Sequence, residues 1–590
     1  MIRNRFRKQL AYLIICGLVC LCSLAGCTQH NYKKEADEQV YNIINQKWPE
    51  NFGTKANYRI SDVPPSPGDI QIEKAVPESG VLTLSQAVAL ATAHNREYQT
   101  QKDELYIKAL DLDLMRHNFE RIYYGNLKGT YANVQGADYV GVGTGLEPRF
   151  NPARAGQDPT ITPQGVLDGD EFSIDNGFGF DQLLTDGTRI GTNVAVSWGR
   201  MLNGALKGES LISLLSFEVA KPLLRGSDRT VVLENLTQAE RDTLYQVRSF
   251  NRFRKTFMVS VINQYYGVLQ LLDATKNAWE NYDTLGRFSE RVEKLANAGR
   301  VPQFELDRIR QDKLQARDTY IQAEKEYKQA LDEFKITLSV HPTTEFQLDL
   351  SELEVLRDTE IIYPDFSETE AVETALLQRL DLANSTDAIF DSQRKVFVAV
   401  DSLRAQLDLG VNANIPLQDL SSSNAKALQD FLLSGLHVDL PFDRDLEKNI
   451  YRKALITLNQ RQREYDEAAD MVMLQVRQAY RDFIEAAELY KVQSESFKLA
   501  EKRFNKTFLL LQYGRASSRR VLSAQDDLFD AQNAATQALV DYTIATLNFY
   551  RDTGVLRVQP DGMWEKGTNK EPYVSELPFV GSLSKSEIGE

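Results

Sequence analysis

The chain has 590 residues and is 42% apolar, which is enough for several ordinary domains or for one elongated domain. Its formal net charge is −15, and a chain this acidic is a poor candidate for binding nucleic acid. All four cysteines lie within the first 27 residues, so a chain cleaved there would have no disulfide and no thiol-ligated metal site.

The first 26 residues have the pattern of a secretory signal peptide. A short apolar stretch, residues 11–24, follows the positive residues Arg3, Arg5, Arg7 and Lys8. The stretch is too short and wrongly flanked for a helix that spans a membrane. Removal of these four positive charges would change the formal net charge from −15 to −19 on the mature chain.

The signal ends in Leu24-Ala25-Gly26-Cys27, which resembles the bacterial lipoprotein processing box. The resemblance implies cleavage before Cys27 and attachment of lipid, palmitate included, to this cysteine. Thr28 follows, and the absence of Asp at that position favours sorting to the outer membrane, again by resemblance. The alternative is a cysteine left by chance in a cysteine-rich stretch.

After the signal, no window has 18 consecutive apolar residues, so the sequence predicts no transmembrane helix. Such a chain could cross a membrane only as a closed β-barrel. Residues 27–80 are polar and contain Pro64-Pro65-Ser66-Pro67-Gly68, which predicts a lipidated, extended N-terminal segment.

Two parts of the chain resemble each other. Residues 84–91 and 368–375 open helical patterns in the same way, at an offset of about 284. Further matches lie 215 residues apart: Tyr265 and Tyr480, Gly299-Arg300 and Gly514-Arg515, and Ala316 and Ala531. Colinear matches at several places indicate a tandem duplication. We predict repeats over residues 81–350 and 351–556, followed by a C-terminal tail over residues 557–590.

Both repeats contain very long helical patterns. No proline occurs between Pro222 and Pro302, or between Pro441 and Pro560, and apolar residues recur there at heptad-like spacing. A helix of about 65 residues would be roughly 100 Å long. A dimeric coiled coil is the simplest alternative reading of such stripes.

Alternating apolar and polar residues predict strands between the helices. The second repeat has them at about residues 406–416 and 434–442, and the first repeat at about 122–136 and 188–222. The Gly-, Asp- and Pro-rich segment at about 137–187 is predicted to be an extracellular insertion that ends near a hairpin turn at Asp186-Gly187. Whether residues 171–199 add barrel strands or form a projecting hairpin stays open, and a soluble sandwich is the alternative to a membrane barrel.

The sequence has no pattern typical of an enzyme. The five histidines, His30, His94, His117, His341 and His437, do not lie at ligand spacing from one another, and no HExxH, CxxC or P-loop pattern occurs. We expect no catalytic residue, no metal site and no cofactor apart from the lipid on Cys27.

The order helix, strands, long helices, repeated twice, resembles the TolC-like outer-membrane efflux proteins. The resemblance covers about residues 82–555. It rests on residues 84–88, on Lys221-Pro222-Leu223-Leu224-Arg225-Gly226, on the two Gly-Arg pairs, and on residues 521–528. It implies a mainly α chain of duplicated helix-strand-strand-helix units. Three chains would share a 12-stranded β-barrel, four strands each, continued by a long periplasmic α-helical barrel.

The resemblance also implies partners and a location. The protein would be a homotrimeric lipoprotein of the cell outer membrane that extends into the periplasm. It would act as the exit duct of a tripartite efflux or type I secretion system, with a membrane-fusion adaptor and an inner-membrane pump of the RND or ABC type. The alternative is a structural or adhesive lipoprotein whose helices form a periplasmic coiled-coil spacer without channel activity.

In this family the turns between the long helices form the periplasmic tip, which docks on the adaptor. The corresponding residues here are Gly299, Arg300, Val301, Gly514, Arg515 and Ala516. Glycine suits such turns because it lacks a Cβ and adopts a positive φ.

Charged residues after the two turns are candidates for a gate. Glu305 and Asp307 follow the first turn, whereas Arg519 and Arg520 occupy the second, where the family often has acidic residues. We hypothesise that these opposite charges pair and hold the tip shut. Each exposed pair contributes only about 0–1 kcal/mol, but three-fold symmetry repeats it. The alternative is that they are solvated helix-end residues.

Overall fold

The structure is a computed structural model, and it describes residues 29–48, 58–60, 80–138, 166–201, 209–299, 302–358, 361, 363–364, 367–416, 432–440, 442–513, 515–558 and 564–566. The predicted signal peptide and Cys27 lie outside these residues. Within them, none of the helices combines the length and the apolar character that crossing a membrane requires.

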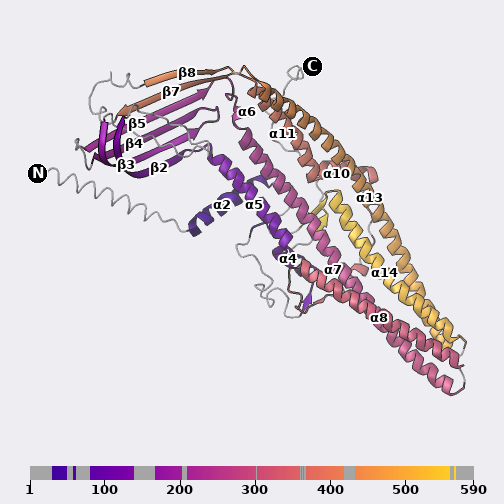
Figure 1. The fold of residues 1–590 in the computed structure, drawn as a ribbon. Coiled ribbons are helices and arrows are strands. Elements are labelled where there is room, and N and C mark those ends of the chain that lie inside the picture. Colours follow the sequence, from indigo (N-terminus) through magenta and orange to yellow (C-terminus); the bar gives the residue numbers. More distant parts are fainter. Residues whose placement is uncertain are drawn as a thin grey trace. The chain divides into compact units, whose positions relative to one another are not determined.

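Each repeat opens with two consecutive helices. They are α4 (Leu84–His94) and α5 (Arg96–His117) in the first repeat, and α10 (Glu368–Gln378) and α11 (Leu380–Ser402) in the second (Figure 1). α4 begins with a capping box between Thr83 and Gln86, and α10 with one between Ser367 and Glu370. In each box the side chain of each residue accepts a hydrogen bond from the backbone N–H of the other residue, which fixes the first turn of the helix. The two boxes lie 284 residues apart, as the duplication predicts.

Two long helices follow in each repeat. They are α7 (Glu234–Asn297) and α8 (Gln303–Thr337), and then α13 (Asp445–Gln512) and α14 (Ser518–Asp552). α8 and α14 each have 35 residues, and both their first and their last residues lie 215 positions apart. The backbone beyond them matches as well, because Ser339 and Gly554 both have a positive φ, of 56° and 83°. The duplication is therefore confirmed in three dimensions.

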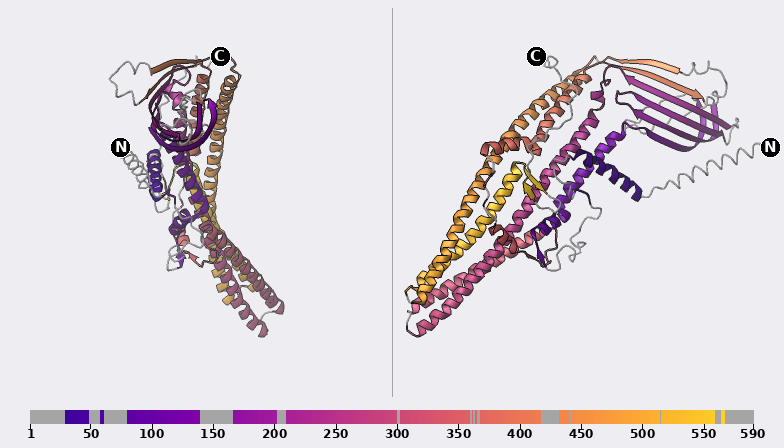
Figure 2. Two further views of the ribbon diagram at one scale, coloured as in Figure 1. Left: turned by 60° about the vertical axis from the view of Figure 1, so that its left-hand side comes forward. Right: turned by 180° about the vertical axis from the view of Figure 1, so that it is seen from behind.

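A six-stranded antiparallel sheet has the order β2-β3-β4-β5-β7-β8 (Figures 1 and 2). Its strands are β2 (Ile122–Asp138), β3 (Val166–Leu183), β4 (Arg189–Met201), β5 (Glu209–Pro222), β7 (Gln406–Pro416) and β8 (Leu432–Asp439). β5 of the first repeat pairs with β7 of the second, with Phe217 opposite Ala413, so one sheet joins both repeats.

The sheet has six strands where the resemblance implies four. β3 lies inside the segment predicted to be an extracellular insertion, and with β4 it fills the place between β2 and β5. Glycine and aspartate at Asp175, Gly177 and Gly179 make this strand read like a loop, because these residues are uncommon in strands. The sequence left open whether residues 171–199 add strands or form a projecting hairpin. In the structure they form most of β3 and β4, which are strands of the sheet.

The N-terminal segment also differs from the expectation of an extended chain, because it contains the helix α2 (Gln29–Lys47). Val40, Ile43 and Ile44 are buried and recur at helical spacing. The polar composition of the rest of the segment hides this short apolar stripe.

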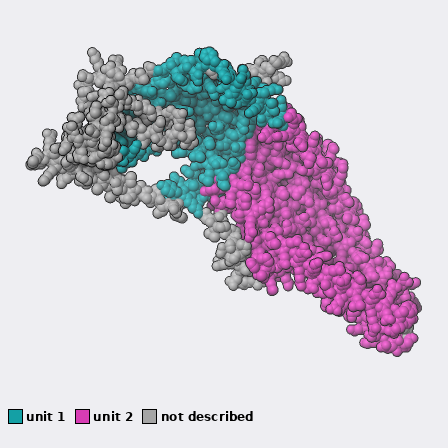
Figure 3. Space-filling view, in the orientation of Figure 1, with its two compact units in different colours: residues 1–47, 107–243, 389–460 teal, residues 48–106, 244–388, 461–590 magenta. Residues whose placement is uncertain are grey.

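The shorter elements are α6 (Arg229–Val232), α9 (Ser351–Asp358), β1 (Val81–Leu82), β6 (Gln347–Leu348), β9 (Leu556–Val558) and β10 (Trp564–Lys566). The chain forms two compact units, which Figure 3 colours separately. One contains the sheet and α2, and the other contains α4, α8, α10 and α14. Each unit contains segments of both repeats, so the repeats are not separate compact bodies.

Candidate functional site

One face of the sheet is apolar along all six strands. Side chains alternate between the faces of a strand, and cross-strand partners point to the same side, so the register assigns each residue to a face. Tyr123 pairs with Phe180, and their ring centroids are 5.9 Å apart. The same face carries Leu127, Phe178, Val194, Trp198, Leu215, Phe217, Leu409, Val411, Leu436 and Val438.

The opposite face of the sheet is polar. Its residues include Asn126, Asp175, Asn193, Ser197, Glu218, Asp408, Asn412 and His437. The Ser197 hydroxyl donates a hydrogen bond to the Asp175 carboxylate across β4 and β3. A sheet that is apolar on one face and polar on the other suits a wall between lipid and a water-filled channel.

The predicted hairpin turn at Asp186-Gly187 is present between β3 and β4. The Leu184 N–H donates to the Thr188 carbonyl at 2.8 Å, and the Thr188 N–H donates to the Asp186 carboxylate at 3.0 Å. The Thr188 backbone N–H, helped by the Lys221 ammonium at 3.1 Å, lowers the pKa of Asp186 to about 2. These contacts tie the hairpin to the end of β5.

Gly187 makes this close approach possible. It has a φ of 79°, and a Cβ there would lie 2.8 Å from the carbonyl oxygen of Gly226 and 2.9 Å from the ring of Pro222. Any larger residue would therefore have an unfavourable φ and would also clash with Gly226 and Pro222. The predicted strand-to-helix junction Lys221–Gly226 thus holds the hairpin turn.

A left-handed glycine ends the first long helix. Gly299 has a φ of 71°, and its N–H donates to the Ala296 carbonyl at 2.9 Å. Among the described residues, no atom lies within 4 Å of a Cβ at this position, so the requirement for glycine is conformational. The next two predicted tip residues, Arg300 and Val301, lie outside the described residues.

The second turn is closed by a backbone hydrogen bond in which the Arg515 N–H donates to the Leu510 carbonyl at 2.9 Å. Arg515 is exposed and Ala516 is half-buried, whereas Gly514 lies outside the described residues. α8 and α14 restart after Pro302 and Ser517, and neither of these residues caps its helix with a side chain.

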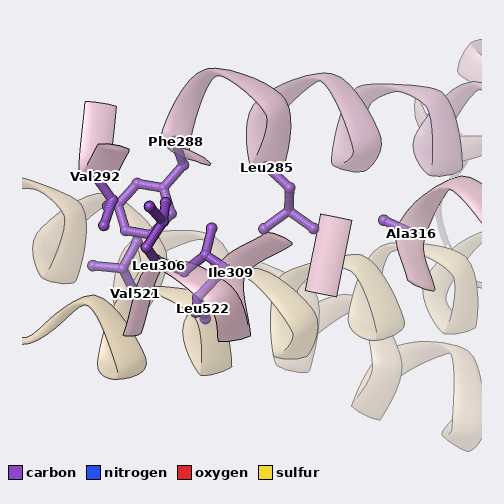
Figure 4. Close-up of a cluster of buried hydrophobic side chains, with 8 residues drawn as sticks. All are labelled: Leu285, Phe288, Val292, Leu306, Ile309, Ala316, Val521 and Leu522. Carbon is purple, nitrogen blue, oxygen red and sulfur yellow. The ribbon is translucent and has the colours of Figure 1, made fainter. Parts of the chain in front are cut away.

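A shared apolar cluster joins the helix ends next to the two turns (Figure 4). Its buried members come from three helices: Leu285, Phe288 and Val292 of α7, Leu306, Ile309 and Ala316 of α8, and Val521 and Leu522 of α14. Phe504, Phe508 and Leu511 of α13 pack against them. We call these residues the turn cluster. The cluster fixes the two turns against each other by burying apolar surface.

The predicted gate residues are Glu305, Asp307, Arg519 and Arg520. Glu305 is half-buried and the other three are exposed. Asp307 lies 3.8 Å from Arg310, which also contacts Glu293 at 2.8 Å. No ion pair joins the two acidic residues to the two arginines in the part of the chain that the structure describes. The segments meet through their apolar neighbours in the turn cluster, and the gate stays a prediction for the assembled protein.

Solved structures of three bacterial channels resemble this chain. CusC covers 80% of this chain and 92% of its own, with 13% identity and a TM-score of 0.53. The CmeC outer-membrane channel of Campylobacter jejuni has 14% identity and a TM-score of 0.52, and covers 82% and 87%. The MtrE outer-membrane channel of Neisseria gonorrhoeae, in its open state, has 13% identity and a TM-score of 0.52, and covers 80% and 88%.

The chain has the fold of these outer-membrane channels. No known family profile and no curated protein matches its sequence. The likeness is therefore visible in the arrangement of helices and strands, while most side chains differ.

Within this channel fold, sequence reasoning missed the charged contacts between helices. Arg503 of α13 pairs with Asp527 of α14. Partial loss of water and the neighbouring Asp312, Asp530 and Asp527 carboxylates raise the pKa of Asp526. Spacing along one helix does not identify these pairs, because each partner lies on a different helix.

Charged residues of α7 and α11 also form buried contacts. Arg248 and Asp387 lie 2.7 Å apart with side chains that are 3% and 5% exposed. Arg394 and Glu234 lie 2.9 Å apart and are also buried. Both helices carry repeated charged residues, which could have indicated these ion pairs. The same pattern is typical of a helix face exposed to water, so it does not identify buried pairs. Among the described residues, no cluster of histidine, cysteine or acidic side chains could hold a metal ion.

Proposed function

We propose that the protein is an outer-membrane channel, the exit duct of a tripartite efflux or type I secretion system. One observation carries the proposal: a sheet with one apolar and one polar face is followed along the chain by helices of 64 and 68 residues, one in each repeat. The first element suits passage through lipid, and the second suits a duct beyond it. The fold shared with solved outer-membrane channels supports this reading.

The assembly is a homotrimer in this proposal. A single sheet leaves β2 and β8 as edge strands, with unpaired N–H and C=O groups. Such edges are not tolerated in lipid, so neighbouring copies must pair them. The turns at Gly299 and Arg515 would meet a periplasmic adaptor, and an inner-membrane pump of the RND or ABC type would supply the energy. The Cys27 lipid would anchor the chain to the outer membrane.

Reconstitution tests the channel. The full-length protein, extracted from outer membranes in detergent, is expected to migrate in SDS as an oligomer that dissociates on heating, and to conduct ions in planar bilayers. Two neighbouring residues of β8 provide matched variants, because Leu436 lies on the apolar face and His437 on the polar face. We expect Leu436→Arg to reduce insertion, since arginine on a lipid-facing strand is destabilising, by up to about 2–4 kcal/mol at the bilayer midplane and less towards the interfaces.

The matched variant His437→Arg is expected to insert and conduct, with a shift of ion selectivity towards anions. A water-soluble monomer or dimer without conductance would overturn the proposal and favour the coiled-coil spacer lipoprotein. The lipid anchor has its own test: Cys27→Ala is expected to lose incorporation of radiolabelled palmitate, and unchanged labelling would contradict lipidation at this residue.

A further inference from the structure

The β3–β4 hairpin forms part of the sheet along its whole length. β2 and β3 pair from Ile122 opposite Asp181 to Asp138 opposite Val166. β4 pairs with β3 on one side and with β5 on the other, from Arg189 opposite Ala220 to Arg200 opposite Glu209. The hairpin therefore separates β2 from β5, which would otherwise be neighbours in a four-stranded wall.

The two faces of the sheet continue through the hairpin, with polar residues such as Asn176 and Thr192 on the mainly apolar face. Phe178 and Val194 are cross-strand partners on the apolar face, and Trp198 lies on the same face. Asp175 and Ser197 are partners on the polar face. A hairpin that projected into water would have no need of an apolar face in register with that of β5 and β7. This pattern indicates that β3 and β4 stand in the membrane wall.

The ends of the sheet are suited to closure by further copies of the chain. β2 runs away from α5 and β8 runs towards α13, so the two edge strands are antiparallel to each other. With an even number of alternating strands, β8 of one copy meets β2 of the next in antiparallel orientation. The helix-linked ends of both edges, near Ile122 and Asp439, lie at the same end of the sheet.

We propose that three copies close an 18-stranded barrel, six strands each, rather than the 12-stranded barrel that the resemblance implies. The proposal rests on the proposed function, because it takes the trimeric channel as given. Barrel diameter grows roughly linearly with strand number, so the opening in the membrane would be about 1.5 times as wide as with 12 strands. Natural barrels of this size hold a water-filled channel. The cargo class that this wall admits is a bulky hydrophilic solute.

Tryptophan fluorescence tests the place of the hairpin. The chain has four tryptophans, and Phe replacements of Trp48, Trp279 and Trp564 leave Trp198 as the reporter. In the channel reconstituted into vesicles of brominated phosphatidylcholine, Trp198 emission is expected to be lost relative to vesicles of unbrominated lipid. Aqueous iodide is expected to leave it largely unchanged.

The matched control moves the tryptophan to the opposite face of the same strand, in Trp198→Phe with Ala195→Trp. Ala195 is the cross-strand partner of Gly177 and Leu214, on the polar face. Its emission is expected to respond to iodide and to resist brominated lipid. A channel that conducts while Trp198 resists brominated lipid would overturn the wider barrel and leave the proposed function standing. If no conducting oligomer forms, both proposals fail.

Polymer exclusion measures the width itself. Neutral polymers of graded size, added on the outer side, are expected to enter the full-length channel at sizes excluded from a variant that lacks residues 166–201. An equal size limit in the two channels would contradict the wider barrel. The tryptophan experiment keeps the proposal testable if the shortened chain does not fold.

Discussion

Lys255 is a buried amine among arginines. Its ammonium donates to the Gly554 carbonyl at 3.2 Å, and Arg254, Arg252 and Arg557 lie near it. Burial is the main cause that lowers the pKa of Lys255 to about 7, and the positive charges of the three arginines lower it further. The sequence around it has several basic residues and reads as a solvated patch, so nothing along the chain identified this position.

The lowered pKa of Lys255 makes the stability of the protein depend on pH. Above about pH 7 the folded chain holds Lys255 neutral, whereas the unfolded chain keeps it protonated up to about its ordinary pKa. The unfolded state therefore binds more protons, and the free energy of unfolding rises with pH across this window. We expect the thermal unfolding midpoint of the detergent-solubilised protein to increase between pH 7 and pH 9 more steeply than in Lys255→Met. The exposed Lys491→Met is the control, and equal slopes in all three proteins would contradict the prediction.

At the scale of elements, α7 and α11 are joined by ion pairs rather than by apolar packing alone. Arg248 and Asp387 form a buried pair, and Arg252 contacts Asp381 at 3.1 Å. A buried pair contributes little net stability, because both charges lose their water. Its removal on one side only is costly, because the partner stays buried and charged.

The Arg248–Asp387 pair leads to an asymmetric set of variants. Asp387→Ala is expected to destabilise the protein by about 3–5 kcal/mol, since it leaves the Arg248 guanidinium buried without this carboxylate. Replacement of both partners, as Arg248→Met with Asp387→Leu, is expected to restore most of the thermal unfolding midpoint. A double variant as unstable as Asp387→Ala would show that the helices need the charges themselves.

Helices and strands were predictable where the spacing of apolar residues within the element itself indicates its type. The offsets of 284 and 215 located the helix starts and turns, and the clean alternation of β7 gave its bounds. The place of β3 stayed open because its polar face consists mainly of glycine and aspartate, and α2 was missed because its apolar stripe has few residues. The turn cluster and the α7–α11 pairs depend on which helices become neighbours, and periodicity and spacing along the chain do not reveal that.

At the scale of the whole molecule, several features remain open to other copies. They are the edge strands β2 and β8 and the exposed side chains of Arg519 and Arg520 after the second turn. The predicted gate charges do not pair within one chain, so a latch would have to act between neighbouring chains. The channel fold was predictable from the order of helices and strands, whereas the number of strands in the wall was not.

The gate prediction can be tested in the assembled channel. If Arg519 and Arg520 pair with Glu305 or Asp307 of a neighbouring copy, the double variant Arg519→Glu with Arg520→Glu is expected to raise the resting conductance. Repulsion would replace up to about 1 kcal/mol of attraction at each of three symmetric sites. Arg463→Glu, at an exposed position of α13 49 residues before the helix end at Gln512, is the control. Resting conductance equal to that of the unchanged protein would show that the residues are solvated helix ends.

Ser339 and Gly554, which both have a positive φ, also bear on the duplication of the chain. Both repeats bend their backbone in the same way after a 35-residue helix, although only one of them uses glycine there. A bend at the same offset in both repeats is what duplication of one half-chain predicts, although the two residues differ in type. Among the described residues, the second repeat has no pair of strands that corresponds to the β3–β4 hairpin, so the two repeats contribute different numbers of strands to the sheet. The hairpin is therefore the place where the described part of the sheet departs from the two-fold repetition of the chain.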